Sequence, residues 1–338
     1  MIGLITTIAT FGTVLGPAVG GWLTESYGWR SIFLFALPWG LVIMVGALVF
    51  MKPDGPPKKL RLDARGIGLF SFSLAAAMVG ITTLGNGNGG FWSLPVGIAA
   101  LLLGALLMVK FIGHERTAAE PIIDRVLLLS RPFMAANFFN TVLGVAVGVL
   151  TFIPLYAVTV HGMSIFESGL ITTPKSVSLM LASLIVTFSL HRLGYRLPMV
   201  LGWTILGIAC SLFAAESTIV SRFLPGYGVW PVIVIVSLAG IGLGVCVPAS
   251  NNACIDMLPE RVSTITGVRQ TFRNLGSTLA IAATSIALQA SGDYVRGFNF
   301  VFAGAALIVF ASIPAIFLMP RSAYDRAPAD VRAELASG

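Results

Sequence analysis

The sequence predicts an all-α integral membrane protein with about ten transmembrane helices. Apolar residues make up 56% of the 338-residue chain and charged residues only 10%, whereas soluble domains carry about 25% charged residues. The apolar residues fall into ten runs of about 20 residues, which is the length that crosses the hydrocarbon core of a bilayer. The basic residues lie mainly between these runs, so the 21 lysines and arginines indicate membrane topology rather than nucleic-acid binding.

The predicted spans cover residues 2–24, 31–51, 66–85, 91–112, 134–160, 168–190, 197–215, 229–251, 264–288 and 297–319. Fifteen of the 21 basic residues fall on one side, in the linkers after the even-numbered spans, at Lys110 near the end of the fourth span, and in the tail. Three fall on the other side, and the remaining three lie deeper inside spans. Because cytoplasmic loops are rich in lysine and arginine, both chain ends are expected in the cytoplasm.

The first span carries glycines at helical spacing around one proline. Gly12, Gly16 and Gly20 are four residues apart, so they share one helix face. Such a face lets another helix approach closely, and Pro17 removes a backbone donor and bends the helix. Together with Gly21 these residues predict a packing surface, which is either a generic small-residue face or a more specific motif.

The segments between spans differ in composition. Residues 52–65 are basic and contain three prolines, which is typical of a flexible connector. Residues 113–132 combine charges with a short apolar run and predict a short amphipathic helix on the membrane surface. The tail, residues 321–338, is polar and is expected to be disordered.

Lys175 is the clearest functional candidate because an ionisable residue inside a span is costly. It lies eight residues beyond Glu167, which at ~1.5 Å per residue places it ~12 Å below the outer surface. It also follows Pro174, where the helix is expected to be irregular. Lys175 either lines a cavity that meets substrate or protons, or it forms a contact that joins two helices.

Arg269 and Arg273 are four residues apart on one face of the ninth span, beside the polar pair Gln270 and Asn274. Two arginines on one face repel each other unless acids or anions lie nearby, and Asp256 and Glu260 are the expected partners. The pair is either a latch that rearranges between inward-open and outward-open states or a static anchor at the interface.

Asn137 and Asn140 in the fifth span predict hydrogen bonds, either within a cavity or as links between helices. Cys210, Cys246 and Cys254 show no metal-ligand spacing and are expected to act as small hydrophobic residues. The three histidines also lack metal spacing, so no metal or other cofactor is predicted.

Gly12–Gly21 resembles the signature G-x-x-x-G-P-x-x-G-G of drug:proton antiporters in the major facilitator superfamily. Later segments resemble the fourteen-span EmrB/QacA branch of that superfamily, in the same order: Trp29–Phe33, Gly162–Ser164, His191–Arg196, Gly240–Gly244, and Gly267 with Arg273–Gly276. The residues His191, Arg192, Gly194 and Arg196 match a degenerate copy of the D-R-x-G-x-R loop, with histidine at the position of the acid.

The resemblance implies a domain organisation. Residues 1–51 would be the last two helices of an N-terminal bundle, residues 66–112 two inserted linker helices, and residues 133–320 a complete C-terminal six-helix bundle. The first four spans of the family would be missing. We therefore expect the six-helix bundle to be well packed and the first two spans to be loosely held.

The resemblance also implies a secondary active transporter, or a fragment of one, in a bacterial inner membrane. Its partners would be the lipid bilayer, small hydrophobic or cationic solutes, protons, and a periplasmic adaptor protein. A membrane enzyme has no support, because no nucleotide, metalloprotease or serine-nucleophile motif is present. A truncated remnant that does not transport, or a partner subunit of a membrane complex, stays an alternative.

Overall fold

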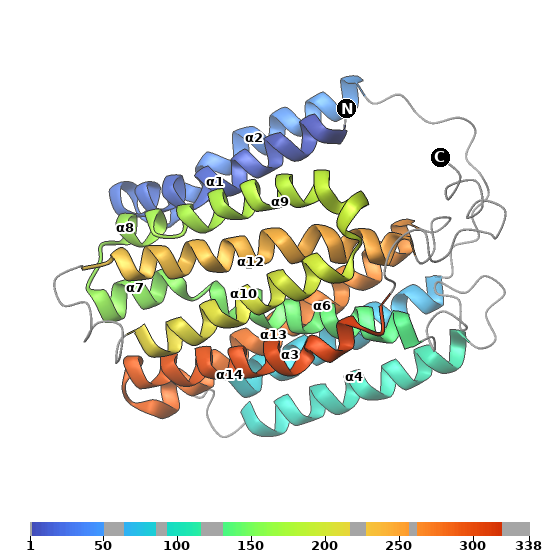
Figure 1. Ribbon diagram of the computed structural model, residues 1–338. Coiled ribbons are helices and arrows are strands. Elements are labelled where there is room, and N and C mark those ends of the chain that lie inside the picture. Colours follow the sequence, from blue (N-terminus) through green and yellow to red (C-terminus); the bar gives the residue numbers. More distant parts are fainter. Residues whose placement is uncertain are drawn as a thin grey trace, which may run out of the picture.

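The computed structural model describes residues 2–50, 64–85, 93–115, 131–216, 228–256 and 262–319, which form helices with no strand among them (Figure 1). The helices are α1 (Ile2–Tyr27), α2 (Arg30–Phe50), α3 (Ala64–Gly85), α4 (Ser93–Glu115), α6 (Arg131–Leu150), α7 (Ile153–His161), α8 (Ile165–Leu170), α9 (Thr173–Leu193), α10 (Arg196–Ala215), α12 (Trp230–Ile255), α13 (Val262–Ser291) and α14 (Tyr294–Ile316). The amphipathic helix predicted within residues 113–132, the linker 52–65 and the tail lie largely or wholly outside the described residues.

Two of the predicted spans are interrupted by prolines. The fifth is divided into α6 and α7 at Thr151–Phe152, just before Pro154. The sixth is divided into α8 and α9 at Ile171–Thr172, just before Pro174. Each proline lacks the N–H that would continue the helical ladder, so each break follows from the sequence, and the irregularity expected before Lys175 is confirmed.

Eight segments of the described residues are long and apolar enough to cross a membrane, by length and composition. They include most of the predicted spans, while α1 and α13 are long enough but are not among the eight. In α13, Arg269, Gln270, Arg273 and Asn274 lower the apolar character of the helix. The membrane-spanning roles of α1 and α13 therefore stay predictions.

The helices from α6 to α14 pack side by side in the order α13, α6, α14, α10, α12 and α9 (Figure 1). The α3–α4 pair packs against α13, and α1 packs against α8 and α9. The α7–α8 and α13–α14 connections lie at one end, on the left in Figure 1, and the α9–α10 connection lies at the other. We name these the outer end and the inner end, following the predicted orientation.

Glycines set the closest approaches between these helices. A Cβ atom at Gly144 of α6 would overlap the carbonyl oxygen of Arg273 in α13, and a Cβ atom at Gly276 would overlap that of Thr141 in α6. Between α10 and α12, a Cβ atom at Gly202 would lie 2.6 Å from the carbonyl oxygen of Gly242. Backbones thus touch without intervening side chains, which is the usual basis of helix association in lipid.

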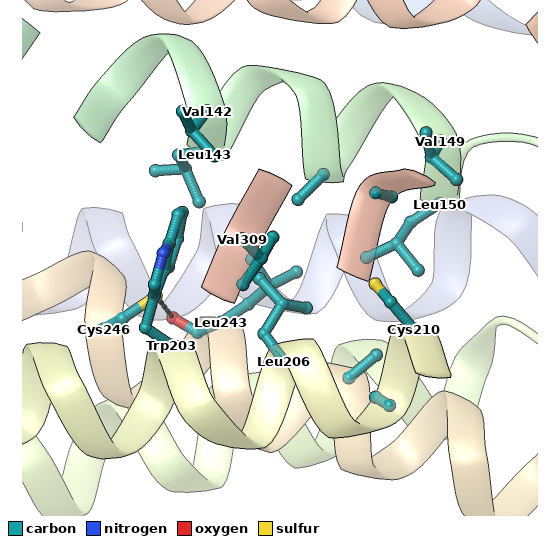
Figure 2. Close-up of a cluster of buried hydrophobic side chains, with 14 of the residues drawn as sticks. Val142, Leu143, Val149, Leu150, Trp203, Leu206, Cys210, Leu243, Cys246 and Val309 are labelled. Atoms are coloured by element: carbon teal, nitrogen blue, oxygen red, sulfur yellow. Dashed lines mark hydrogen bonds between the residues drawn. The ribbon is translucent and has the colours of Figure 1, made fainter. Parts of the chain in front are cut away.

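Figure 2 shows the core that these contacts enclose, with side chains from α6, α10, α12 and α14. Trp203 of α10 belongs to this core and is fully buried. Its ring lies 4.3 Å from that of Phe139, and its indole N–H donates to Ser312 Oγ at 2.7 Å. The single polar atom of the indole is therefore satisfied inside an apolar core. The three cysteines are free and buried, as predicted.

The first two helices contrast with this core. The helix α2 has no buried residue, and a Cβ atom at Gly12, Gly16 or Gly20 would meet nothing within 4 Å. Only the outer part of the α1 motif is in contact: Gly21 packs against the backbone of α8, and the carbonyl of Pro17 lies against Gly169 of α8. The loose packing expected of these two helices is thus observed, and the face of Gly12, Gly16 and Gly20 has no neighbour among the described residues.

Candidate functional site

Among the described residues between 131 and 319, the charged side chains that lie within a predicted membrane span and away from its ends are three cations: Lys175 on α9, and Arg269 and Arg273 on α13. The acidic residues in this range whose side chains are described lie at helix ends or in connections. Unpaired cations are costly inside a membrane protein. The surroundings of these three side chains therefore decide what the site can do.

Arg269 is only 9% exposed, and its guanidinium Nη1 donates a hydrogen bond to Asn251 Oδ1 of α12. It makes no ion pair with any described acid. The predicted partner Asp256 is wrong, because its carboxylate accepts a hydrogen bond from Tyr195 instead, and Glu260 lies outside the described residues. Arg269 is thus a buried cation held by a neutral amide.

Asn140 of α6 reaches the same turn of α12. Its side-chain amide is buried and donates to the carbonyl of Ala136 at 2.7 Å and towards Cys254 Sγ at 3.9 Å. Cys254 follows Asn251 by three residues, so both residues lie on one helix face. The structure thereby joins Asn140 and Arg269, 129 residues apart in the chain, in a single polar cluster between α6, α12 and α13.

Three buried atoms of this cluster have no hydrogen-bond partner: Asn140 Oδ1, Ser250 Oγ and Arg269 Nε. Thr173 Oγ1 on α9 is the other such atom among the described residues. Each unsatisfied buried group costs about 1–3 kcal/mol. A cluster that combines a free donor with free acceptors is suited to water, to a polar group of a solute, or to partners in another conformation.

Arg273 lies one turn from Arg269 and is half-buried. Its carbonyl faces Gly144, and its guanidinium makes no hydrogen bond or ion pair within the described residues. The neighbouring pair Gln270 and Asn274 is exposed, with Gln270 Nε2 donating to Asn274 Oδ1 at 3.1 Å. This face of α13 is therefore polar and open.

Lys175 lies apart from this cluster, towards the outer end. Its backbone packs against Gly240 of α12, eleven residues before Asn251, and its half-buried side chain makes no hydrogen bond or ion pair with a described residue. Eleven helical residues correspond to ~16 Å along the axis. Asn137 is buried on α6 beside Thr141, whose hydroxyl donates to the Asn137 carbonyl at 2.9 Å.

The loop motif joins helix ends at the inner end. His191 and Arg192 are exposed, and Gly194, with φ +67°, ends α9 in a conformation that favours glycine. Arg196 donates two hydrogen bonds to the carbonyl of Met319, at 3.0 and 2.7 Å. Burial and the carboxylate of Asp256 raise the pKa of Tyr195, which keeps its hydroxyl protonated as the donor to Asp256.

A model of the Major Facilitator Superfamily matches residues 1–281 and, in a second overlapping match, residues 176–337. The chain belongs to the major facilitator superfamily. This membership, with the helical fold, confirms the predicted multi-pass membrane protein and classes the chain with transport proteins rather than enzymes.

Individual superfamily relatives are similar at lower identity. Multidrug resistance protein Stp of Mycobacterium tuberculosis is 27% identical over 293 residues, covering 86% of this chain and 52% of the relative. A Multidrug resistance protein B homolog of the same species is 30% identical over 285 residues, covering 82% and 51%. Methylenomycin A resistance protein of Bacillus subtilis is 25% identical over 324 residues, covering 94% and 67%. The chain spans about half the length of the two Mycobacterium relatives.

This superfamily member has a second polar cluster, around Glu216, that was not predicted from the sequence. Glu216, which directly follows α10, is 1% exposed and accepts a hydrogen bond from the hydroxyl of the fully buried Tyr156. His161 Nε2 lies 3.3 Å from the same carboxylate oxygen. The available signal was an acid at the end of an apolar run, but its partners lie 55 and 60 residues away.

Opposing effects act on the pKa of Glu216. Burial raises the pKa of Glu216, whereas the hydrogen bonds from His161 and Tyr156 lower it. The net effect is a pKa below the usual value of 4.5. The carboxylate is therefore ionised in the folded chain at neutral pH.

Glu216→Gln is expected to lower the thermal stability of the chain near neutral pH and to have little effect in strong acid. Since the folded pKa is depressed, the stabilisation by Glu216 is complete above pH 4.5 and is lost as the pH falls through the folded value. Losing the charged acceptor costs about 1.5–3 kcal/mol of folding free energy.

Thermal unfolding in detergent at several pH values measures this loss of stability. Glu167→Gln is the matched control, because glutamine still serves the capping box with Ser164, and an equal loss at all pH values would contradict the prediction.

Proposed function

We propose that the chain contributes the C-terminal bundle of a proton-driven multidrug exporter of the fourteen-span type. The names of its relatives support export of drugs, and the motif in α1 supports the antiporter branch. The observation that carries the proposal is the polar cluster around Arg269, a buried cation with no acidic partner among the described residues and with unsatisfied neighbours. A buried cation without an acidic partner destabilises an interface whose only role is to join two helices.

In this proposal the cluster lines the substrate path, and Arg269 with Arg273 acts as a latch. Alternating access requires side chains that exchange partners as two bundles rock about a central site. Arg269 Nε and the guanidinium of Arg273 lack partners in this conformation, so both are free to gain them in another. Lys175, ~16 Å further towards the outer end, and Asn137 are proposed to meet the solute or protons along the same path.

The solutes proposed are small and hydrophobic or cationic, as the resemblance implies, with protons as the coupling ion. A periplasmic adaptor is not proposed as a partner, because none of the described residues supports a binding surface for one. The motif residues Gly12, Gly16 and Gly20 support a requirement for further helices, since that face of α1 has open space beside it. A non-transporting remnant, or a subunit that packs against a separate half, stays the alternative.

The chain alone, reconstituted in proteoliposomes with an imposed proton gradient, is expected to move no fluorescent cationic dye above empty vesicles. A chimaera in which four N-terminal spans of Multidrug resistance protein Stp precede Ile2 is expected to move the dye, because α1 then regains neighbours. The four spans alone are the control. A chimaera that inserts and folds but moves no dye would contradict the export proposal, and transport by the chain alone would contradict the need for further helices.

The inner end is proposed to face the cytoplasm of a bacterium, with both chain ends on that side. Among the described residues, Arg65, Lys110, Arg131, Arg192 and Arg196 lie at the inner end. Only Arg30 and Arg296 lie at the outer end. This bias follows the positive-inside rule.

Single cysteines at the exposed positions Ser26 and His191, in a chain whose three native cysteines are replaced by alanine, are expected to react from opposite sides of the membrane. A membrane-impermeant maleimide added to intact cells should label Ser26→Cys, and His191→Cys only after the cells are opened. Labelling of both positions in intact cells would overturn the orientation.

A further inference from the structure

We propose that Tyr156, His161 and Glu216 form a proton-binding site at the outer end, and that its occupancy controls the contact between α8 and α1. This inference rests on the proposed proton-driven function, since it names a site for the coupling ion. Its geometry is independent of the cluster around Arg269, which lies towards the inner end.

The carboxylate of Glu216 is enclosed by its partners. Tyr156 is fully buried, and the rings of Phe213, Phe298 and Phe302 lie 6.0, 5.2 and 6.1 Å from its ring. These rings surround the ring of Tyr156, whose hydroxyl donates to the carboxylate. The side chain of His161 is 18% exposed, so the imidazole is the part of the site that meets the outer solution.

Proton binding at this site changes its net charge. Histidine is the side chain whose charge ordinarily changes between about pH 5 and 8. When a proton from the outer solution binds a ring nitrogen of His161, both ring nitrogens carry hydrogen, and Nε2–H donates to Glu216 Oε2. The pair then changes from a net charge of −1 to neutral, which favours its burial, and release of the same proton restores the net charge of −1.

The neighbouring helices bring few competing charges. The described charged groups on the elements around this site are Glu25 of α1, Glu167 of α8, Lys175 of α9, and Asp293 and Arg296 at the start of α14. None of these five makes a hydrogen bond or ion pair with His161 or Glu216. Glu167 is used in the capping box of α8, and Asp293 caps α14 and lies 3.8 Å from Arg296.

The site is mechanically linked to α1 through two short helices. Tyr156 and His161 both lie on α7, which is separated from α6 by a break and from α8 by three residues. Gly162, with φ +66°, forms the turn after His161.

The next helix, α8, carries the contact with α1. The carboxylate of Glu25 accepts a hydrogen bond from the N–H of Phe166 at 2.6 Å, and Gly169 receives the carbonyl of Pro17. A change at His161 therefore moves the element that holds α1 at the outer end. Protonation is expected to fix α7 against Glu216 and to keep α8 against α1.

The test uses the full chain in lipid nanodiscs, with bimane attached to Ile165→Cys in the background lacking the native cysteines. Ile165 is half exposed, and its backbone lies against Gly21, next to the native quencher Trp22. We expect stronger quenching at about pH 5 than at about pH 8, and loss of this pH dependence in His161→Gln and in Glu216→Gln. His191→Gln is the matched control because it removes a histidine at the inner end. Trp22→Phe removes the quencher and is expected to abolish the quenching at both pH values.

Two further measurements separate folding and transport from proton binding. Tyr156→Phe removes only the hydroxyl and keeps the aromatic packing, so it is expected to fold and to shift the pH midpoint of quenching. Counting proton uptake with an indicator dye, between the same pH values, is expected to give one proton fewer per chain in His161→Gln. Unchanged proton uptake and unchanged pH-dependent quenching in that variant would overturn the inference. Neither readout needs transport, so a failure of the export proposal is recognised separately in the dye assay.

Discussion

Leucine in place of Gly144 is expected to abolish the folded form of the chain. A Cβ atom at this position would overlap the carbonyl oxygen of Arg273, and the reciprocal contact of Gly276 with Thr141 shows that neither backbone has room to withdraw. The atoms involved belong to two helix backbones, so no side chain can rotate away to relieve the overlap. Separating α6 from α13 would also open the cluster that contains Asn140 and Arg269.

Size-exclusion chromatography and thermal unfolding of the detergent-solubilised chain measure this effect. Gly304→Leu is the matched control, because Gly304 lies on α14 and a Cβ atom there would meet nothing within 4 Å. The control is expected to remain monodisperse with unfolding close to that of the parent chain. A Gly144→Leu variant that behaves like the control would contradict the close packing of α6 on α13.

Methionine in place of Arg269 is expected to lower efflux about tenfold or more without reducing stability. The substitution removes a buried cation that has only Asn251 as a partner, and replacing buried charges by apolar side chains of similar volume is often neutral or stabilising by about 1–4 kcal/mol. Part of that gain is offset because Asn251 Oδ1 loses its donor. If Arg269 exchanges partners during transport, its loss removes a coupling free energy on the order of 1–3 kcal/mol, or about tenfold or more in efflux.

Efflux is measured in the chimaera described above, and unfolding in the chain itself. Arg192→Met is the control, since Arg192 is an exposed arginine at the same inner end. The opposite pattern, a clear loss of stability with efflux retained, would assign Arg269 the role of a static anchor. The substitution of Arg269 is thus predicted to lower transport while leaving stability unchanged. This pattern is typical of a residue that destabilises the fold but is needed for function.

The helices themselves could be predicted closely from the sequence. The ten predicted spans correspond to the described helices within a few residues, and the break before Lys175 was expected from Pro174. Hydropathy and proline are local properties of the chain, and the bilayer fixes the length of each span. For the same reason the cations inside spans, Lys175, Arg269 and Arg273, could be selected as candidates before any contact was known.

The partners of those side chains could not be predicted in this way. Asp256 was a reasonable partner for Arg269 by sequence distance, but the tertiary structure pairs it with Tyr195 and gives Arg269 the amide of Asn251. Glu216 is a single acid at the end of a span in the sequence, and only the packing of the helices places Tyr156 and His161 beside it.

The sequence by itself therefore determined which segments are helical, where prolines interrupt them and which charges lie inside spans. The tertiary structure alone decided which helix faces meet and hence which polar groups share a site. The glycine at position 144 was visible in the sequence, but its contact with the carbonyl of Arg273 depends on how two helices cross. Local forces act between neighbours in the chain, whereas packing depends on the combined shapes of all the helices.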